Sequence, residues 1–204
     1  MKNIFVLFLF LSISVFCASC SSSDTTVIAF YNFENLFDAV DDSLKNDSEF
    51  LPESRKQWTD ERLKVKMANL SVVIKDLNAD ILGFCETENE AVVKELNDNY
   101  LSSLKYDIAY LESPDGRGID VGMYFNSEKF ELISVTGDTV PSVVDLYPTR
   151  LVLHVKLKMK DSDTHIHCFV NHWPSRRGDG GKTELYRINA ALTLKKRITE
   201  IFSI

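Results

Sequence analysis

Three apolar runs of the sequence each end near a polar side chain that can bind a metal ion or a phosphate, namely Asn32, Glu86 and His172. Side chains alternate between the two faces of a strand, so residues two positions apart share a face. On this rule the three share a face with Ile28 and Phe30, with Leu82 and Phe84, and with Ile166, Cys168 and Val170, respectively. If these faces line one core, an amide oxygen, a carboxylate and an imidazole meet at its mouth, where a hard cation and a phosphate can bind.

Each of these side chains also has an ordinary explanation when it is taken alone. Asn32 suits a turn or a cap, a carboxylate such as Glu86 at a strand end is usually solvated, and a histidine such as His172 is usually a structural hydrogen-bonding group. His165 and His167 alternate onto the opposite face, which is expected to be solvated, and no third partner for a zinc site accompanies them. The functional interpretation therefore depends on the convergence of all three side chains.

One segment of the chain concentrates basic residues. Arg176 and Arg177 follow His172 closely and can orient substrate phosphates through paired N–H groups. Arg117, in the string Arg117-Gly118-Ile119-Asp120, is a further candidate for phosphate binding. The alternative for the Arg176–Arg177 pair is a solvated turn ahead of a helix.

The composition is that of a globular protein. The chain has 204 residues, 45% of them hydrophobic and 26% charged, which is enough for one domain with its own core. These values exclude a disordered, collagen-like or polytopic membrane protein. The formal net charge of −7 argues against a protein that coats nucleic acid without regard to sequence. A phosphate can still be bound through a local basic patch or through a metal ion that reverses the local charge.

Residues 1–19 are predicted to form a lipoprotein signal peptide. An apolar run follows Lys2, and small residues stand immediately before Cys20. This arrangement resembles a bacterial lipoprotein signal, whose cleavage leaves Cys20 as the lipidated N-terminus ahead of a tether over residues 20–25. The expected location is then the cell envelope, with the lipid on Cys20 as the link to the membrane. An ordinary secretory peptide or a tilted anchor stays open as an alternative.

The rest of the chain alternates between strand-like and helix-like segments. β-Branched and aromatic runs predict strands over 26–31, 80–86, 106–111, 119–125, 130–136, 151–159 and 165–171. Helical spacing and caps predict helices over 60–77, over 88–97 and from 183 onward, the last with an apolar stripe of Ile188, Ala191, Leu194, Ile198 and Ile201. Two strand–helix steps followed by a series of hairpins predict an α+β fold or a layered αββα sandwich.

Four strings follow one another in the sequence: YNFENLFD (31–38), DILGFCETEN (80–89), RGIDV (117–121) and VNHWPSRRG (170–178). This series resembles the endonuclease/exonuclease/phosphatase superfamily, most closely its exported bacterial branch, from about residue 26 to the end of the chain. The resemblance implies a four-layer αββα sandwich, of which residues 26–204 form the N-terminal part.

The resemblance also implies roles for the residues at the strand ends. In that family the Asn of the first strand and the Glu of the second hold a divalent metal, Mg²⁺ or Mn²⁺, and these roles fall on Asn32 and Glu86. A histidine at the end of a later strand binds the scissile phosphate, and it matches His172. The family pattern has one residue between Asn and His, whereas Asn171 and His172 are adjacent here, so Asn171 has no assigned role. The implied substrate is a phosphoester, either a nucleic acid, a phospholipid head group or a small phosphodiester.

Two further strings of the family do not occur in this sequence. A GDFN-like string supplies the Asp that positions the attacking water, and an SDH-like string supplies another acid and a His on the phosphate. The domain is therefore expected to be truncated before its C-terminal strands, and the metal-dependent phosphodiester hydrolase to be incomplete. The alternative is a non-catalytic surface lipoprotein that retains part of the fold as a binding module or a remnant. No obligate protein partner is expected.

Overall fold

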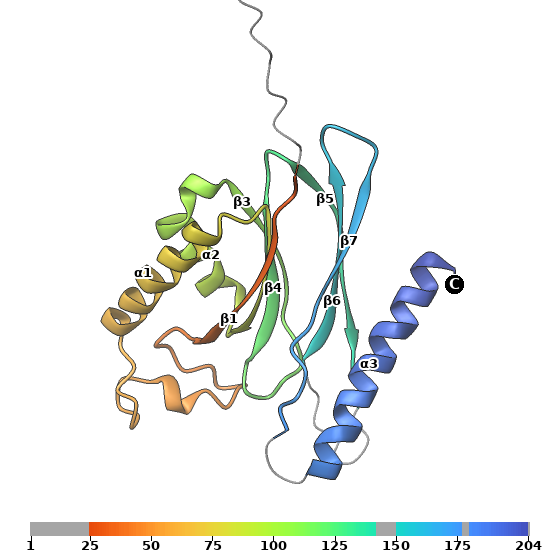
Figure 1. Cartoon of the computed structure of the whole chain (residues 1–204). Coiled ribbons are helices and arrows are strands. Elements are labelled where there is room, and N and C mark those ends of the chain that lie inside the picture. The colour runs from red at the N-terminus through yellow and green to blue at the C-terminus, as the bar shows by residue number, and fades with distance from the viewer. Residues whose placement is uncertain (1–24, 142–149, 177–179, 204) are drawn as a thin grey trace, which may run out of the picture.

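The computed structural model describes residues 25–141, 150–176 and 180–203. Within these ranges the chain forms seven strands and three α-helices, with short 3₁₀ turns at η1 (Ser48–Phe50) and η2 (Ser102–Leu104). Two sheets face each other, and helices lie on the outer side of each sheet (Figure 1). Among the described helices, none has the length and apolar character needed to cross a membrane.

The first sheet has the strand order β1-β2-β4-β3. Its strands are β1 (Ile28–Leu36), β2 (Ile81–Thr87), β3 (Tyr106–Leu111) and β4 (Asp120–Asn126). β1 and β2 are parallel because helix α1 (Asp60–Leu77) connects them, whereas β4 is antiparallel to both of its neighbours. Helix α2 (Glu90–Tyr100) follows β2, and both helices cover the outer face of this sheet (Figure 1).

The second sheet is antiparallel, with the order β5-β6-β7. Its strands are β5 (Phe130–Thr139), β6 (Leu151–Met159) and β7 (His165–Val170). Helix α3 (Gly180–Phe202) lies over the outer face of this sheet (Figure 1).

Local signals in the sequence explain where α1 begins and ends. The Thr59 hydroxyl accepts a hydrogen bond from the backbone N–H of Arg62, and Asn78 adopts the left-handed conformation that closes many helices. The buried side chains recur at helical spacing and face the first sheet; they are Leu63, Met67, Leu70, Ser71 and Ile74. The predicted helix over 60–77 is therefore confirmed.

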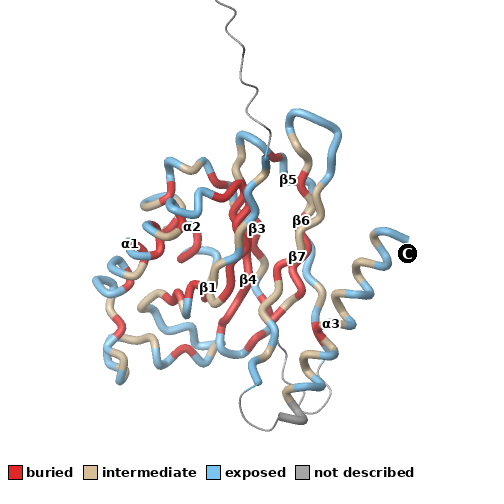
Figure 2. The backbone as a smooth tube through the Cα atoms, viewed as in Figure 1, coloured by how far each residue is buried: buried red, intermediate tan, exposed pale blue. Residues whose placement is uncertain are grey.

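Apolar side chains fill three layers. The helices α1 and α2 pack on the first sheet through a cluster that includes Met67, Leu82 and Phe84. The two sheets pack on each other through a second cluster that includes Cys85 and Val155. A third, smaller cluster joins α3 to the second sheet through Val140, Val152 and Ala190. Figure 2 shows the buried residues concentrated on the central strands, and the order helix–sheet–sheet–helix confirms the predicted αββα sandwich.

The predicted stripe on the last helix is partly wrong. Ile188 is 46% exposed, whereas Ala190 is 2% exposed. Ala190 and Leu194 lie one helical turn apart and both contact the second sheet, so the helix is rotated relative to the prediction. The bounds also differ, because α3 begins at Gly180 and the strand before His172 ends at Val170.

Candidate active site

β1 departs from regular strand geometry directly after Asn32. Glu34 and Asn35 have left-handed backbones, with φ of 54° and 63°, and the pairing with β2 changes register between Asn32 and Leu36. The Asn32 side-chain oxygen accepts a hydrogen bond from the backbone N–H of Glu34 at 2.7 Å. Backbone strain and bulges of this kind concentrate at functional sites. Asn32 lies half-buried at this bulge, opposite Cys85 of β2.

Glu86 occupies a second bulge, one position beyond the partner of Asn32. Its backbone is also left-handed, with φ of 61°, and the pairing of β2 with β4 changes register between Cys85 and Thr87. A non-glycine residue in this conformation is uncommon and costs of the order of 1 kcal/mol or more. The two bulges therefore place Asn32 and Glu86 at the same end of neighbouring parallel strands.

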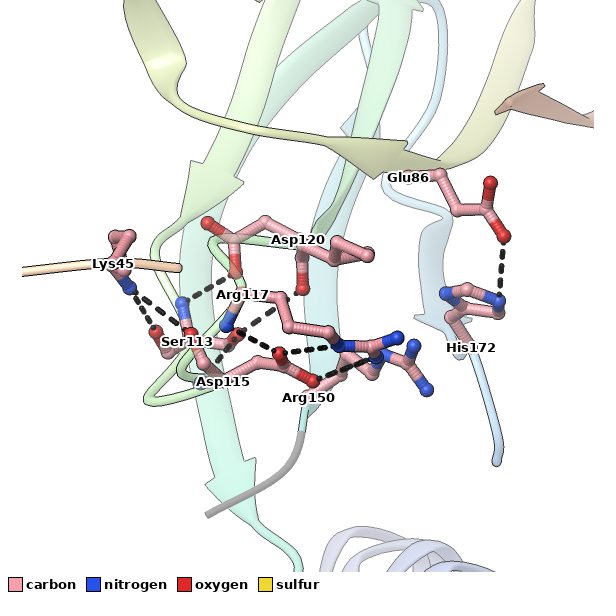
Figure 3. A network of polar contacts seen from close by, with 9 residues as sticks. Lys45, Glu86, Ser113, Asp115, Arg117, Asp120, Arg150 and His172 are labelled. Atoms are coloured by element: carbon pink, nitrogen blue, oxygen red, sulfur yellow. Dashed lines mark hydrogen bonds and ion pairs between the residues drawn. The ribbon is translucent and has the colours of Figure 1, made fainter. Parts of the chain in front are cut away.

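The bulge decides which way the Glu86 carboxylate points. Regular alternation would place it with Leu82 and Phe84, which pack in the layer beneath α1 and α2. Instead, its Oε1 lies 3.3 Å from Nε2 of His172, which follows β7 of the opposite sheet (Figure 3). Glu86 and His172 thus meet as predicted, although the alternation argument placed Glu86 on the wrong face.

His172 is a neutral imidazole at neutral pH. Burial, followed by the positive charge of Arg150, lowers the pKa of His172 to about 4 in spite of the nearby Glu86. The contact with Glu86 is therefore one between a neutral imidazole and a carboxylate rather than an ion pair, and we assign the ring proton to Nε2 because this nitrogen faces the carboxylate oxygen. Nδ1 then carries a lone pair, is buried and has no hydrogen-bond partner within the described residues. A buried polar atom without a partner marks a position that a ligand can complete.

A buried ion pair lies near His172 (Figure 3). Nε of Arg150 lies 3.3 Å from Oδ2 of Asp115, and the two side chains are only 9% and 8% exposed. The contact lacks hydrogen-bond geometry, so this Nε has no hydrogen-bond partner in the described part of the chain. Arg117 binds the same carboxylate, from Nε to Oδ1 at 3.2 Å and from Nη2 to Oδ2 at 3.3 Å. Two guanidinium groups share one carboxylate, which favours the binding of a further anion.

Buried polar groups hold the loop that carries Asp115. Asp120 is fully buried and accepts hydrogen bonds from the Tyr110 hydroxyl at 2.9 Å and from the backbone N–H of Ser113 at 2.8 Å. The Lys45 ammonium donates to the backbone oxygens of Ser113 at 3.2 Å and Asp115 at 3.3 Å. These contacts fix the loop before any ligand binds (Figure 3).

The predicted basic residues have different outcomes. Arg117 lies in the network with Asp115. Arg176 is exposed, and no contact among the described residues links it to Glu86 or His172. Arg177 and the predicted lipidation residue Cys20 lie outside the described residues.

Arg150 was not predicted as a site residue from the sequence. A long-range partner, Asp115, holds this side chain in place, and sequence spacing does not reveal such a partner. The available signal was an arginine directly before the apolar strand β6, at a position where a charge must be paired if it is buried.

His167 is not on a solvated face as expected. It is half-buried beneath α3, with Nδ1 2.9 Å from Nε2 of His154 and its ring against Phe202. The expectation failed because α3 covers this side of the second sheet. The contacts are those of a structural histidine pair.

Glu86 and Asn32 suit a hard divalent cation. Mg²⁺ prefers oxygen ligands, binds through one or two carboxylates and keeps several waters. The Glu86 side chain is 20% exposed, so water can reach it. Over the described ranges, no group of three or more His, Cys, Asp or Glu side chains is placed to hold a metal ion. Glu86 and Asn32 would therefore supply only part of the coordination, with water and a phosphate supplying the rest.

The sequence matches the profile of the endonuclease/exonuclease/phosphatase family over residues 27–203, which include Asn32, Glu86 and His172. The chain belongs to the endonuclease/exonuclease/phosphatase family. No match was found among curated proteins.

Solved structures share the fold of this endonuclease/exonuclease/phosphatase family member. A protein of the same family from Bacteroides vulgatus is 16% identical, with a TM-score of 0.58 over 87% of this chain and 61% of its own. A mannosyl-6-phosphatase from Bacteroides thetaiotaomicron is 15% identical, with a TM-score of 0.58 over 87% of this chain and 60% of its own. ANGEL2, a 2′,3′-cyclic phosphatase, is 23% identical, with a TM-score of 0.53 over 78% of this chain and 45% of its own. At these sequence identities the similarity shows the fold alone. The chain spans no more than 61% of the length of any of these three proteins.

Proposed function

We propose that this protein is a metal-dependent phosphoester hydrolase whose metal and phosphate sites lie at the ends of β1, β2 and β7. The observation that carries the proposal is the 3.3 Å contact between Glu86 and His172. It brings a carboxylate of one sheet and a neutral imidazole of the other close to the guanidinium group of Arg150. Membership in the endonuclease/exonuclease/phosphatase family supports this class of reaction.

Each side chain of the site has a distinct part in the proposed reaction. Glu86 and Asn32 would hold Mg²⁺ or Mn²⁺, an ion that neutralises charge on the phosphate and stabilises the leaving oxygen. Nδ1 of His172 can accept a hydrogen bond from water or from a protonated phosphate oxygen. Arg150 supplies a fixed guanidinium that can donate to two phosphate oxygens. Because these groups are held before substrate binds, little reorganisation is needed during the reaction.

The proposed substrate class is a phosphoester, which includes nucleic acids, phospholipid head groups and small phosphodiesters. Two of the structural relatives are, by name, a mannosyl-6-phosphatase and a 2′,3′-cyclic phosphatase. The net charge of −7 works against long duplex DNA, because the field of an acidic protein repels a polyanion.

We also propose that the protein is anchored in the cell envelope through lipid on Cys20. The support is the sequence of residues 1–19, in which an apolar run and small residues precede that cysteine.

Calorimetry with Mg²⁺ and Mn²⁺ tests the proposed metal site. Glu86→Gln keeps the shape of the side chain and removes its charge, so we expect binding to fall at least about tenfold, or about 1.4 kcal/mol. Glu90→Gln, at an exposed position at the start of α2, is the matched control and should bind like wild type. Equal binding by Glu86→Gln and wild type would remove Glu86 from the site.

Hydrolysis of bis(p-nitrophenyl) phosphate in Mg²⁺ then distinguishes the two functional alternatives. Turnover that disappears in Glu86→Gln supports a hydrolase. Metal and phosphate binding without turnover supports a non-catalytic binding module instead.

A further inference from the structure

A cavity of about 550 Å³ opens between the end of β1 and helix α1. Asn32 forms part of its wall, so the cavity adjoins the proposed metal site. The other charged and amide side chains that line it are Glu34, Glu61, Arg62, Lys66 and Asn69. Apart from Asn32, none of these residues has a part in the reaction proposed above.

Two basic side chains of α1 face this cavity, one helical turn apart. The Lys66 ammonium is half-buried and donates to the backbone oxygen of Glu34 at 2.9 Å. The Arg62 guanidinium donates to the backbone oxygens of Lys56 and of Gln57, the second at 3.3 Å. Within the described residues, neither Lys66 nor Arg62 forms an ion pair, because no carboxylate oxygen lies within 4.0 Å of either side-chain cation. Both therefore keep N–H groups for an anion.

Electrostatics connect this cavity to the Glu86 site. Burial lowers the pKa of Lys66, while the negative charges of Glu34 and Glu86 act in the opposite direction. Lys66 is therefore close enough to interact with the carboxylate proposed to hold the metal ion. Hydrogen bonds from its own backbone and from Thr59 lower the pKa of Glu61, so that carboxylate is already engaged at the start of α1.

The lining offers two cations for an anionic group and one half-buried aromatic ring. Phe33 and Trp58 also line the cavity, but they are only 0% and 9% exposed. These two rings offer little area on which a base or a sugar could stack, whereas the half-buried ring of Tyr31 also lines the cavity and can contact such a group. The groups that can donate to an anion are the Lys66 and Arg62 cations and the amides of Asn32 and Asn69. Because the exposed carboxylates of Glu34 and Glu61 line the cavity as well, an anion would bind beside the two cations.

We propose that this cavity binds a second phosphate of the substrate, while the scissile phosphate lies at Glu86 and His172. This inference rests on the proposed function and narrows the substrate to phosphoesters that carry at least two phosphate groups. Lys66 and Arg62 contact the second phosphate directly, and Asn32 lies between the two phosphate positions.

Calorimetry with two nucleotide probes tests the second-phosphate cavity. Thymidine 3′,5′-bisphosphate and thymidine 3′-monophosphate are titrated into the full chain in metal-free buffer, so that neither probe is hydrolysed. The bisphosphate is expected to bind about tenfold more tightly, which corresponds to about 1.4 kcal/mol. Lys66→Met should remove most of this advantage without changing monophosphate affinity, and Lys66→Arg should restore it because the charge returns.

Lys64→Met is the matched control, since Lys64 is an exposed residue of α1 outside the cavity lining. It should leave both affinities unchanged, and circular dichroism should show the same helix content for all variants. Equal affinity for the two probes in wild type, or equal losses in Lys64→Met and Lys66→Met, would overturn the second-phosphate cavity.

Arg150→Met distinguishes this inference from the proposed function. If Arg150→Met weakens the binding of both probes while the wild-type protein binds the bisphosphate no more tightly than the monophosphate, the scissile site stands and only the second-phosphate cavity is refuted. If that variant binds both probes like wild type, the proposed phosphate site itself fails.

Two further probes identify the source of the second phosphate. Lys66-dependent binding of a four-residue oligothymidylate supports a single-stranded nucleic acid, whereas Lys66-dependent binding of fructose 1,6-bisphosphate supports a small phosphorylated metabolite. Binding of every probe with no dependence on Lys66 would contradict the proposal.

Discussion

Among the single residues of the site, Arg150 combines strong charge with deep burial. Its side chain is 9% exposed and lies beside a carboxylate that Arg117 also binds. Burial of a guanidinium is costly unless its N–H groups are satisfied, and its Nε has no hydrogen-bond partner among the described residues. A phosphate bound beside His172 would supply the missing acceptors, which is why Arg150 is assigned to phosphate binding.

Replacement of Arg150 should weaken phosphate binding. Arg150→Met removes a charge-assisted contact, so the affinity for inorganic phosphate should fall roughly 10- to 100-fold by calorimetry. Arg150→Lys should be intermediate, because it keeps the charge and loses the planar fork. Arg117 still satisfies Asp115 in both variants, so both should fold. An effect no larger than that of Arg55→Met, at an exposed control position, would refute the assignment.

At the scale of the elements, the site lies where bulges in β1 and β2 interrupt the regular geometry of the first sheet. Asn32 keeps the alternating direction of β1, whereas a regular β2 would turn Glu86 to the face of Leu82 and Phe84. Left-handed residues at Glu34, Asn35 and Glu86 break that alternation where the two strands end. The surrounding sheet must therefore be rigid enough to hold these strained conformations.

Packing of β4 against β2 supplies part of that rigidity and can be tested at Gly122. A Cβ at this position would lie 2.5 Å from two ring carbons of Phe84 and 2.9 Å from Tyr110. Gly122→Ala should therefore lower the free energy of unfolding by about 1–3 kcal/mol in urea denaturation. Gly116→Ala is the control, because its Cβ would meet no atom within 4 Å. Equal midpoints for the two variants would show that Phe84 and Tyr110 move aside without cost.

At the scale of the whole molecule, the site and the start of the fold lie at opposite ends of the sandwich. β1 begins at Ile28, and the bulged ends of β1 and β2 lie together at the far end because the two strands are parallel (Figure 1). A lipid on Cys20 would precede β1 by a few residues only. The proposed anchor would therefore join the fold at the end opposite the site.

Lipidation can be tested separately from the site. Cys20→Ser should abolish incorporation of labelled palmitate and move the protein from the membrane fraction to the soluble fraction, because the acylated residue is lost. Its Mg²⁺ affinity should stay at the wild-type value, since Glu86 and Asn32 are unchanged. Palmitate labelling that persists in Cys20→Ser would contradict an anchor at this residue.

Local interactions in the sequence determined the elements and the residue types of the site. Thr59 and Asn78 mark the two ends of α1 through hydrogen bonds with nearby backbone groups. The spacing of apolar residues predicted both the helices and the strands. The motifs around Asn32, Glu86 and His172 identified the family, because these strings are local and occur in order.

Contacts between distant segments determined the rest, and they follow no local rule. The face of Glu86 depends on a bulge between two neighbouring strands, so alternation alone misplaced it. Arg150 became a site residue through Asp115, which lies 35 positions earlier in the chain, whereas Arg176 gained no contact with Glu86 or His172 among the described residues. The sequence determined which groups were available for chemistry. Only the tertiary structure decided which of them converge, because burial and charge at each position depend on every segment packed around it.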